Sequence, residues 1–123
     1  MAEKSKGKAK IPSIKITDKD TGTIYELDFC RESIRFAEAR GFDLDDVGKY
    51  PVTKFPEFFF YAFRMHHRGL AKTQTDALYD RLGGFSPEFL ERMILLYQQA
   101  LEANNVAENT EEMGKNGNVA VEL

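Results

Sequence analysis

The sequence predicts an α+β fold that is mostly α, with an N-terminal β-hairpin followed by about four helices. Three observations lead to this prediction. Alternating apolar residues flank a polar turn near the N-terminus, apolar residues then recur at helical spacing, and glycine or proline stands at most of the boundaries. With 123 residues, 42% of them hydrophobic, the chain is long enough for one compact domain.

The two ends of the chain carry opposite charge. Residues 1–10 contain four lysines and one glutamate, whereas residues 105–123 contain four glutamates and one lysine. Both ends lack the apolar periodicity that would offset the entropy of ordering them. We therefore expect residues 1–10 to be a flexible basic arm, residues 11–104 to be a single globular domain, and residues 105–123 to be a disordered acidic tail.

The N-terminal half of the domain contains a predicted hairpin and one predicted helix. SIKITDKDTGTIYELDF alternates apolar and polar residues around a turn in which Gly22 supplies a positive φ. RESIRFAEARGF has helical spacing, which predicts a helix over residues 31–40 that ends before Gly41. The next segment, DLDDVGKYPVTKFP, holds a glycine and two prolines, so we expect a loop or a short helical turn entered through Asp43.

Three helices are predicted in the C-terminal half. Pro56 is well placed as the first residue of an aromatic helix. The next helix is expected to start at the N-cap Thr73 and to stop at Gly83. The last helix is expected to start after the N-cap Ser86 and to end near Asn105, where the periodicity is lost.

The aromatic helix is the feature that points most directly to function. Phe58 to Phe63 hold five aromatic rings in six positions, and only a narrow strip of Glu57, Tyr61, Arg64 and Arg68 interrupts the apolar surface. Such a helix is either central to its own core or half covered by a partner. We expect Phe59 to be a core residue. The residues expected to contact a partner or a second copy of the chain are Phe58, Phe60, Phe63 and His67.

The residues do not predict a metal or cofactor site. His66 and His67 are adjacent and point apart on a helix, and Cys30 is the only cysteine, so no third ligand is patterned with them. DKDTG resembles part of a calcium loop, but Glu26 comes too early to close it, and a hairpin turn explains the same residues. No phosphate-binding loop or catalytic triad can be assembled, and we expect a protein that is not an enzyme.

A DNA-binding alternative rests on residues 56–82, whose two predicted helices have the outline of a helix-turn-helix. The second of these helices carries Asp76, Asp80 and a single arginine, the wrong charge for a major groove. With a net charge of −3, we expect no nucleic acid as partner. No stretch resembles a membrane span or a signal peptide, and the single cysteine fits a reducing compartment, so we expect a cytoplasmic protein.

From Ile14 to Leu101 the order of features resembles a family of short tail assembly chaperones from phages and prophages with long non-contractile tails, mainly of Gram-positive hosts. Three segments carry the resemblance: TDKDTGTIYELDFCRESIRFAEARGFDLDDVGKYP, then FPEFFFYAFRMHH, then LGGFSPEFLERMILLYQQAL. Within them, the positions that match best are Arg31, Glu38, Gly41, Phe42, Pro51, Phe59, Tyr61, Ala62 and Phe63.

The resemblance implies a protein that coats the tape measure protein, keeps it soluble, recruits tail tube subunits and is absent from the finished virion. A chaperone for a long, apolar, helical chain needs an apolar surface used in many copies at modest affinity. A minor structural subunit of the tail or connector is the remaining alternative. The resemblance also implies a longer frameshifted form, for which Lys115-Asn116 is a candidate slippage site if its codons permit.

Overall fold

The computed structural model describes the backbone of residues 10–114 and the side chains of residues 10–103. Within these residues the fold is α+β and mostly α, with a two-stranded antiparallel hairpin followed by four α-helices and a short 3₁₀-helix, as the sequence predicted. Most of the predicted basic arm, the end of the predicted acidic tail and the pair Lys115-Asn116 lie outside the described residues.

The hairpin joins β1 (Ile14–Asp18) to β2 (Thr23–Leu27). Ile14 lies opposite Leu27 at the open end, and Asp18 lies opposite Thr23 at the turn. Gly22 has the predicted positive φ, 79°, and its N–H donates to the Asp18 carbonyl at 2.7 Å. The left-handed conformation at glycine thus closes the turn and sets the register of the two strands.

Helix α2 (Arg31–Ala39) begins and ends close to where the sequence predicted. The Ser33 hydroxyl accepts a hydrogen bond from the Cys30 N–H at 2.8 Å and so satisfies a donor at the start of the helix. Gly41 follows the helix with a φ of 85°, and its N–H donates to the Glu38 carbonyl at 2.9 Å.

The short 3₁₀-helix η1 (Leu44–Asp46) is entered through Asp43, as predicted. Helix α3 (Pro51–Phe63), however, begins five residues before the predicted start at Pro56. Pro51 is the proline at the start, and Pro56 lies inside the helix. Pro56 cannot donate to the Val52 carbonyl, but Val52 is 89% exposed, so water can bond to that carbonyl instead.

Helix α4 (Lys72–Leu82) ends at Gly83 in the left-handed conformation, as predicted. The prediction of Thr73 as its N-cap was wrong. The N-cap is Ala71, whose backbone N–H donates to the Gln74 side-chain oxygen at 2.8 Å. A glutamine that reaches back to the N-cap can start a helix without a hydroxyl or carboxylate at the cap itself.

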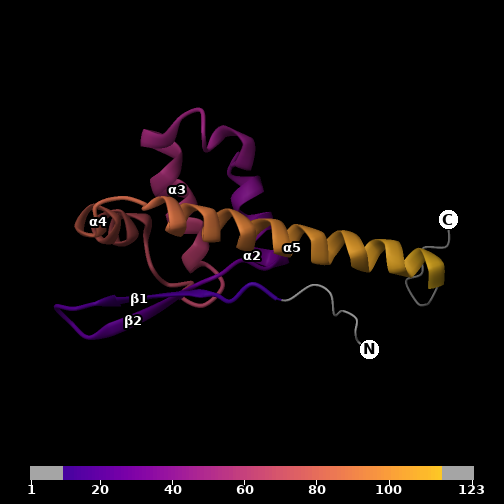
Figure 1. Cartoon of the computed structure of the whole chain (residues 1–123), viewed down its shortest axis with the longest axis horizontal. Coiled ribbons are helices and arrows are strands. Elements are labelled where there is room, and N and C mark those ends of the chain that lie inside the picture. Colours follow the sequence, from indigo (N-terminus) through magenta and orange to yellow (C-terminus); the bar gives the residue numbers. More distant parts are fainter. Residues whose placement is uncertain (1–9, 115–123) are drawn as a thin grey trace.

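Helix α5 (Pro87–Gly114) starts where predicted, since the Ser86 hydroxyl accepts a hydrogen bond from the Phe89 N–H at 3.1 Å. The helix continues to Gly114, past the end predicted near Asn105. Residues 106–113 contain neither glycine nor proline and include alanine, glutamate and methionine, which favour helix. In Figure 1, α5 runs horizontally and its C-terminal part, in yellow, extends beyond the other elements.

The core forms around α3, which packs against α2, α4 and β2. Figure 1 shows the hairpin below α5, with α3 crossing behind the start of that helix. Phe59 is fully buried, as predicted. The sequence left open whether α3 is central or half covered by a partner, and the structure places most of its C-terminal half inside the core. The buried residues of this half are Phe58, Phe59, Tyr61, Ala62 and Phe63.

Candidate functional site

Two of the four residues predicted to contact a partner lie inside the core. Phe58 is 0% exposed and Phe63 is 1% exposed. Phe58 stacks on Phe29 and on Phe42, each with ring centroids 5.5 Å apart. Only Phe60 and His67 keep part of their surface open to solvent. The expectation of a partner surface at Phe58 and Phe63 is therefore corrected, because other elements of the chain already cover these rings.

Tyr61 also differs from its predicted position in a polar strip. It is 5% exposed, and its ring packs edge-on against Phe42 at 5.2 Å and Phe36 at 6.0 Å. Burial raises the pKa of its hydroxyl. A tyrosine has an apolar body, so the buried ring extends the core toward α2.

Next to this part of the core lies a surface of aromatic and arginine side chains, which we call the arginine–aromatic surface: Phe36, Arg40, Phe60, Arg64 and Arg68. The rings of Phe36 from α2 and Phe60 from α3 have centroids 6.2 Å apart. The guanidinium groups of Arg64 and Arg40 lie 3.9 Å and 4.3 Å from the centre of the Phe36 ring, within cation–π distance.

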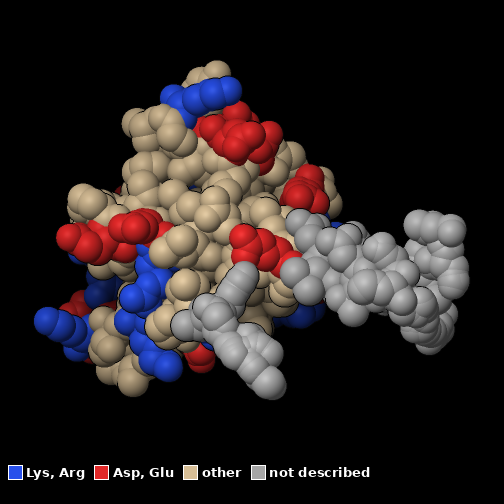
Figure 2. Space-filling model, turned by 45° about the vertical axis from the view of Figure 1, so that its right-hand side comes forward, with Lys and Arg blue, Asp and Glu red and all other residues tan. Residues whose placement is uncertain are grey.

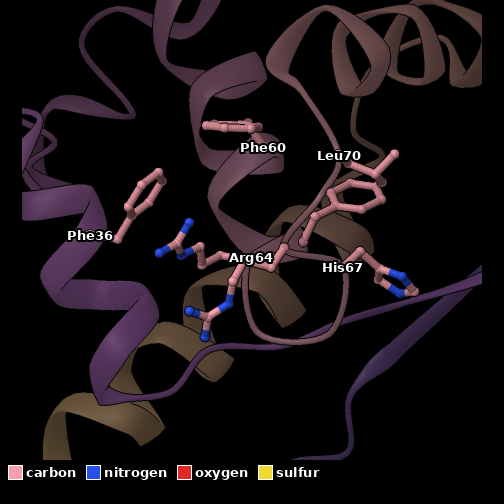
Figure 3. A pocket seen from close by; sticks show the side chains of 7 residues that line it. Phe36, Phe60, Arg64, His67 and Leu70 are labelled. Carbon is pink, nitrogen blue, oxygen red and sulfur yellow. The ribbon is translucent and has the colours of Figure 1, made fainter.

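Figure 3 shows Phe36 and Phe60 approaching from two different helices, with Arg64 between α2 and α3. The hollow between these side chains and Leu70 has a volume of about 10 Å³, room for one water molecule. A hollow of this size cannot hold a substrate or cofactor.

Glu32 on α2 positions the arginines of this surface. Its carboxylate accepts hydrogen bonds from Arg64 Nε at 3.3 Å and from Arg64 Nη2 at 3.0 Å, and it lies 3.5 Å from Arg68 Nη2. The hydrogen bond from Arg64 is the main cause that lowers the pKa of Glu32. Two-point contact fixes the plane of the Arg64 guanidinium, while the Arg68 side chain remains 61% exposed.

His67 has a structural role at the edge of this surface. Its Nε2 atom accepts a hydrogen bond from the Glu26 backbone N–H at 2.9 Å, and its ring packs edge-on against Tyr25 at 5.4 Å. In Figure 3 the ring points away from Phe36. Burial, with a smaller contribution from His66, lowers the pKa of His67 and favours the neutral ring that can accept this bond.

The sequence model of one protein family matches residues 1–123, the whole chain, and its description is a domain of unknown function, DUF5055. The chain belongs to the DUF5055 family. No curated protein and no solved structure matches it. Since the family description gives no activity, a function for this DUF5055 protein has to be argued from its surfaces.

On the other side of α2, the DUF5055 chain has an open groove of about 620 Å³ between the segment that follows α2 and the helix α5. We call it the acidic groove. Its lining residues are Glu38, Gly41, Phe42, Asp43, Leu44, Asp45, Tyr97, Gln98 and Leu101. Figure 2 shows acidic side chains in red over the upper part of one face, at the height of the segment between α2 and α3.

The carboxylates of the calcium-like turn have a partner within the DUF5055 chain. Arg81 on α4 donates to Asp18 at 2.7 Å and to Asp20 at 3.0 Å. Among the residues whose side chains are described, no group of three or more His, Cys, Asp or Glu is close enough to hold a metal ion. Nor does any helix of the described part of the chain have the length and hydrophobicity to cross a membrane.

Sequence analysis missed Phe36, Arg40 and Arg64 as members of a surface. One signal was present, because Phe36 and Arg40 are four residues apart on α2 and therefore share a face. The approach of Arg64 to Phe36 depends on how α2 and α3 pack, which spacing within one helix does not show.

Proposed function

We propose that this protein is a tail assembly chaperone of a phage or prophage with a long non-contractile tail. In this role it binds the tape measure protein, keeps it soluble and helps to recruit tail tube subunits. The observation that carries the proposal is the arginine–aromatic surface, where Phe36 and Phe60 remain partly exposed among Arg40, Arg64 and Arg68. The segments that resemble the chaperone family include the residues on both sides of this surface.

Aromatic residues and arginine are the side chains most enriched where protein–protein binding energy is concentrated. The arginine–aromatic surface has this composition, and Glu32 already holds Arg64 in place, so little side-chain entropy is lost when a partner binds. One such surface per chain gives modest affinity. Many copies along a long partner then give stable coating, while tail tube subunits can still displace each copy.

The geometry does not favour DNA binding by the helix pair at residues 56–82. Lys72 on α4 pairs with Asp76 at 3.1 Å, and Arg81 pairs with Asp18 and Asp20. These basic groups are already neutralised by carboxylates, which would have to be displaced before a phosphate could bind. We therefore retain a protein, not DNA, as the proposed partner.

The test is co-expression with the long helical protein encoded in the same tail gene cluster. We expect its soluble fraction to rise in the presence of the wild-type chain and the two proteins to co-purify, with several copies of this chain per partner. Phe60→Ala should abolish the rise in the partner's soluble fraction. Tyr50→Ala is the matched control, since it removes an aromatic ring that is 58% exposed elsewhere on the molecule.

Two results would count against the proposal. A partner that is equally soluble alone would remove the chaperone role, and equal losses in Phe60→Ala and Tyr50→Ala would remove the arginine–aromatic surface as the binding site. Detection of the chain in purified particles would favour the structural-subunit alternative instead.

A further inference from the structure

The acidic groove differs from the arginine–aromatic surface in both shape and charge. Its apolar part consists of Phe42, Leu44, Tyr97 and Leu101, contributed by the segment after α2 and by α5. At about 620 Å³ the groove is large enough to receive side chains of a partner. Its two walls are a helix and a short helical segment, so it offers no free strand edge to a partner.

All the charged side chains that line the groove are acidic. Glu38, Asp43 and Asp45 are exposed at its rim, and the lining contains neither lysine nor arginine. Asp43 also caps η1 by accepting a hydrogen bond from the Asp45 N–H at 3.0 Å. No hydrogen bond to another side chain is present for Glu38 or Asp45 within the described residues, so their carboxylates are available to basic groups of a partner.

Tyr97 joins the groove to the aromatic core, since it lines the groove and its ring also packs against core rings. The residue is 3% exposed, and its ring packs edge-on against Phe29 at 5.1 Å and Phe58 at 5.9 Å. Burial raises the pKa of Tyr97 to about 12, and Glu38 and Asp43 act in the same direction, so the hydroxyl keeps its proton at neutral pH.

We propose that the acidic groove is a docking site for a basic amphipathic helix of a partner protein. The apolar face of that helix packs on Leu44 and Leu101, and its lysine or arginine residues lie against Glu38 and Asp45. Apolar grooves that receive one face of a helix are a common mode of peptide recognition. The acidic rim selects against helices of negative charge.

The probe is a fluorescent synthetic peptide of about 18 residues with leucine along one helical face and lysine along the other. Two control peptides have the same leucines with glutamate in place of lysine, and the leucine–lysine composition in scrambled order. Binding to the full chain is measured by fluorescence anisotropy. We expect the amphipathic basic peptide to bind at least about tenfold more tightly than either control. Each control lacks either the charge that complements the rim or the apolar face that packs on the floor of the groove.

Variants locate the binding. Glu38→Gln with Asp45→Asn neutralises two rim carboxylates and should weaken binding about tenfold. Asp80→Asn with Glu91→Gln removes the same charge from exposed positions outside the groove and should leave the affinity within about twofold. Leu101→Ala should weaken binding by about tenfold, because it removes apolar contact area from the floor of the groove. Far-ultraviolet circular dichroism checks that each variant is folded.

Three outcomes would overturn the inference. The basic peptide could bind no better than its scrambled control, the two double variants could weaken it equally, or Leu101→Ala could leave the affinity unchanged while the variant is folded. The probe is not the tape measure protein, so the two proposals are tested separately. The peptide can fail to bind while co-expression succeeds, and it can bind while co-expression fails.

Discussion

Two neighbouring residues of α3, Phe59 and Phe60, belong to regions of opposite character. Phe59 is fully buried and packs among aromatic rings of α3, α4 and α5 and the segment between them. Its ring neighbours are Phe63, Tyr79, Phe85 and Phe89. Phe60 is partly exposed and faces Phe36 on α2, in a region where arginines lie over the aromatic surface.

Residue type alone does not decide between core and surface in this helix. Both residues are phenylalanine, and one helical step of about 100° separates them. Phe59 points toward α4 and α5, whose apolar residues enclose it. Phe60 points toward α2, where Glu32 pairs with Arg64 and Arg68 and these charged side chains are partly exposed. The interior should therefore respond to loss of volume, and the surface to loss of charge or of a partner.

Phe59→Ala should have the largest effect, because it removes a ring enclosed by four others. We expect the free energy of unfolding to fall by about 3 to 5 kcal/mol, a large fraction of the roughly 5 to 15 kcal/mol that is typical of a domain. Chemical denaturation monitored by circular dichroism measures the change.

Phe63→Ala tests the same region from a residue first assigned to a partner surface. Since Phe63 is 1% exposed, its replacement should cost a similar amount, about 3 to 5 kcal/mol. A Phe63→Ala variant as stable as the wild type would contradict the division between the two regions.

Much of the fold follows from local signals. The hairpin turn at Gly22, the end of α4 at Gly83 and the cap of α5 at Ser86 all depend on residues within a few positions of the boundary. The predicted start of α3 was wrong because both Pro51 and Pro56 satisfy the local rule for a proline in the first turn of a helix. The choice between them depends on the exposure of the carbonyl that Pro56 leaves without a donor.

Less of the candidate site could be predicted. A helical wheel groups the residues of α3 by direction, but it does not show which direction another helix covers. Phe58 and Phe63 were expected to contact a partner, but rings of β2, of α5 and of the segments on either side of α2 enclose them, including Tyr25 and Tyr97. Glu32 lies 32 residues before Arg64 in the sequence, so their pairing arises only from tertiary structure.

Phe60→Ala should have an intermediate effect on stability and a large one on binding. Because the ring is only partly buried, we expect a loss of about 1 to 2 kcal/mol in the free energy of unfolding. The variant should stay folded at about 25 °C but should fail to solubilise the tape measure protein. Thermal melts beside the co-expression assay separate the two effects. A loss as large as that of Phe59→Ala would place Phe60 in the interior with Phe59.

His67 lies where the two regions meet, since its ring is 6.0 Å from Phe63 and also borders the hollow beside Phe60. Its pKa is lower in the folded chain than its usual 6.5, so the unfolded chain binds a proton first on acidification. Stability should therefore fall as the pH drops below about 6.5, by about 1 kcal/mol when the bond from Glu26 is lost.

His67→Gln tests this prediction, because glutamine can accept the same hydrogen bond without titrating. We expect its melting temperature to change less than that of the wild type between about pH 7.5 and about pH 5.5. His66→Gln is the control, since it removes the adjacent, more exposed histidine and should retain the acid sensitivity. The prediction fails if the two variants respond to acid alike.

Glu32→Gln should have the smallest effect on stability, and that effect should depend on pH and on salt concentration. The Glu32–Arg64 pair is partly exposed, so we expect a loss of less than about 1 kcal/mol at neutral pH. The pKa of Glu32 is lowered from 4.5 in the folded chain, so the pair stabilises the fold above that pH and stops doing so as the pH falls further.

The difference between Glu32→Gln and the wild type should therefore disappear in acid and shrink at about 1 M salt, where screening acts over about 3 Å. Urea denaturation at neutral and acidic pH, each with and without salt, measures both trends. Phe59→Ala is the matched comparison, because its ring neighbours are phenylalanine and tyrosine, which do not titrate in acid, and its cost should stay nearly constant across the four conditions. If the Glu32→Gln difference were equally constant, Glu32 would contribute through packing, and the arginine–aromatic surface would be an extension of the core.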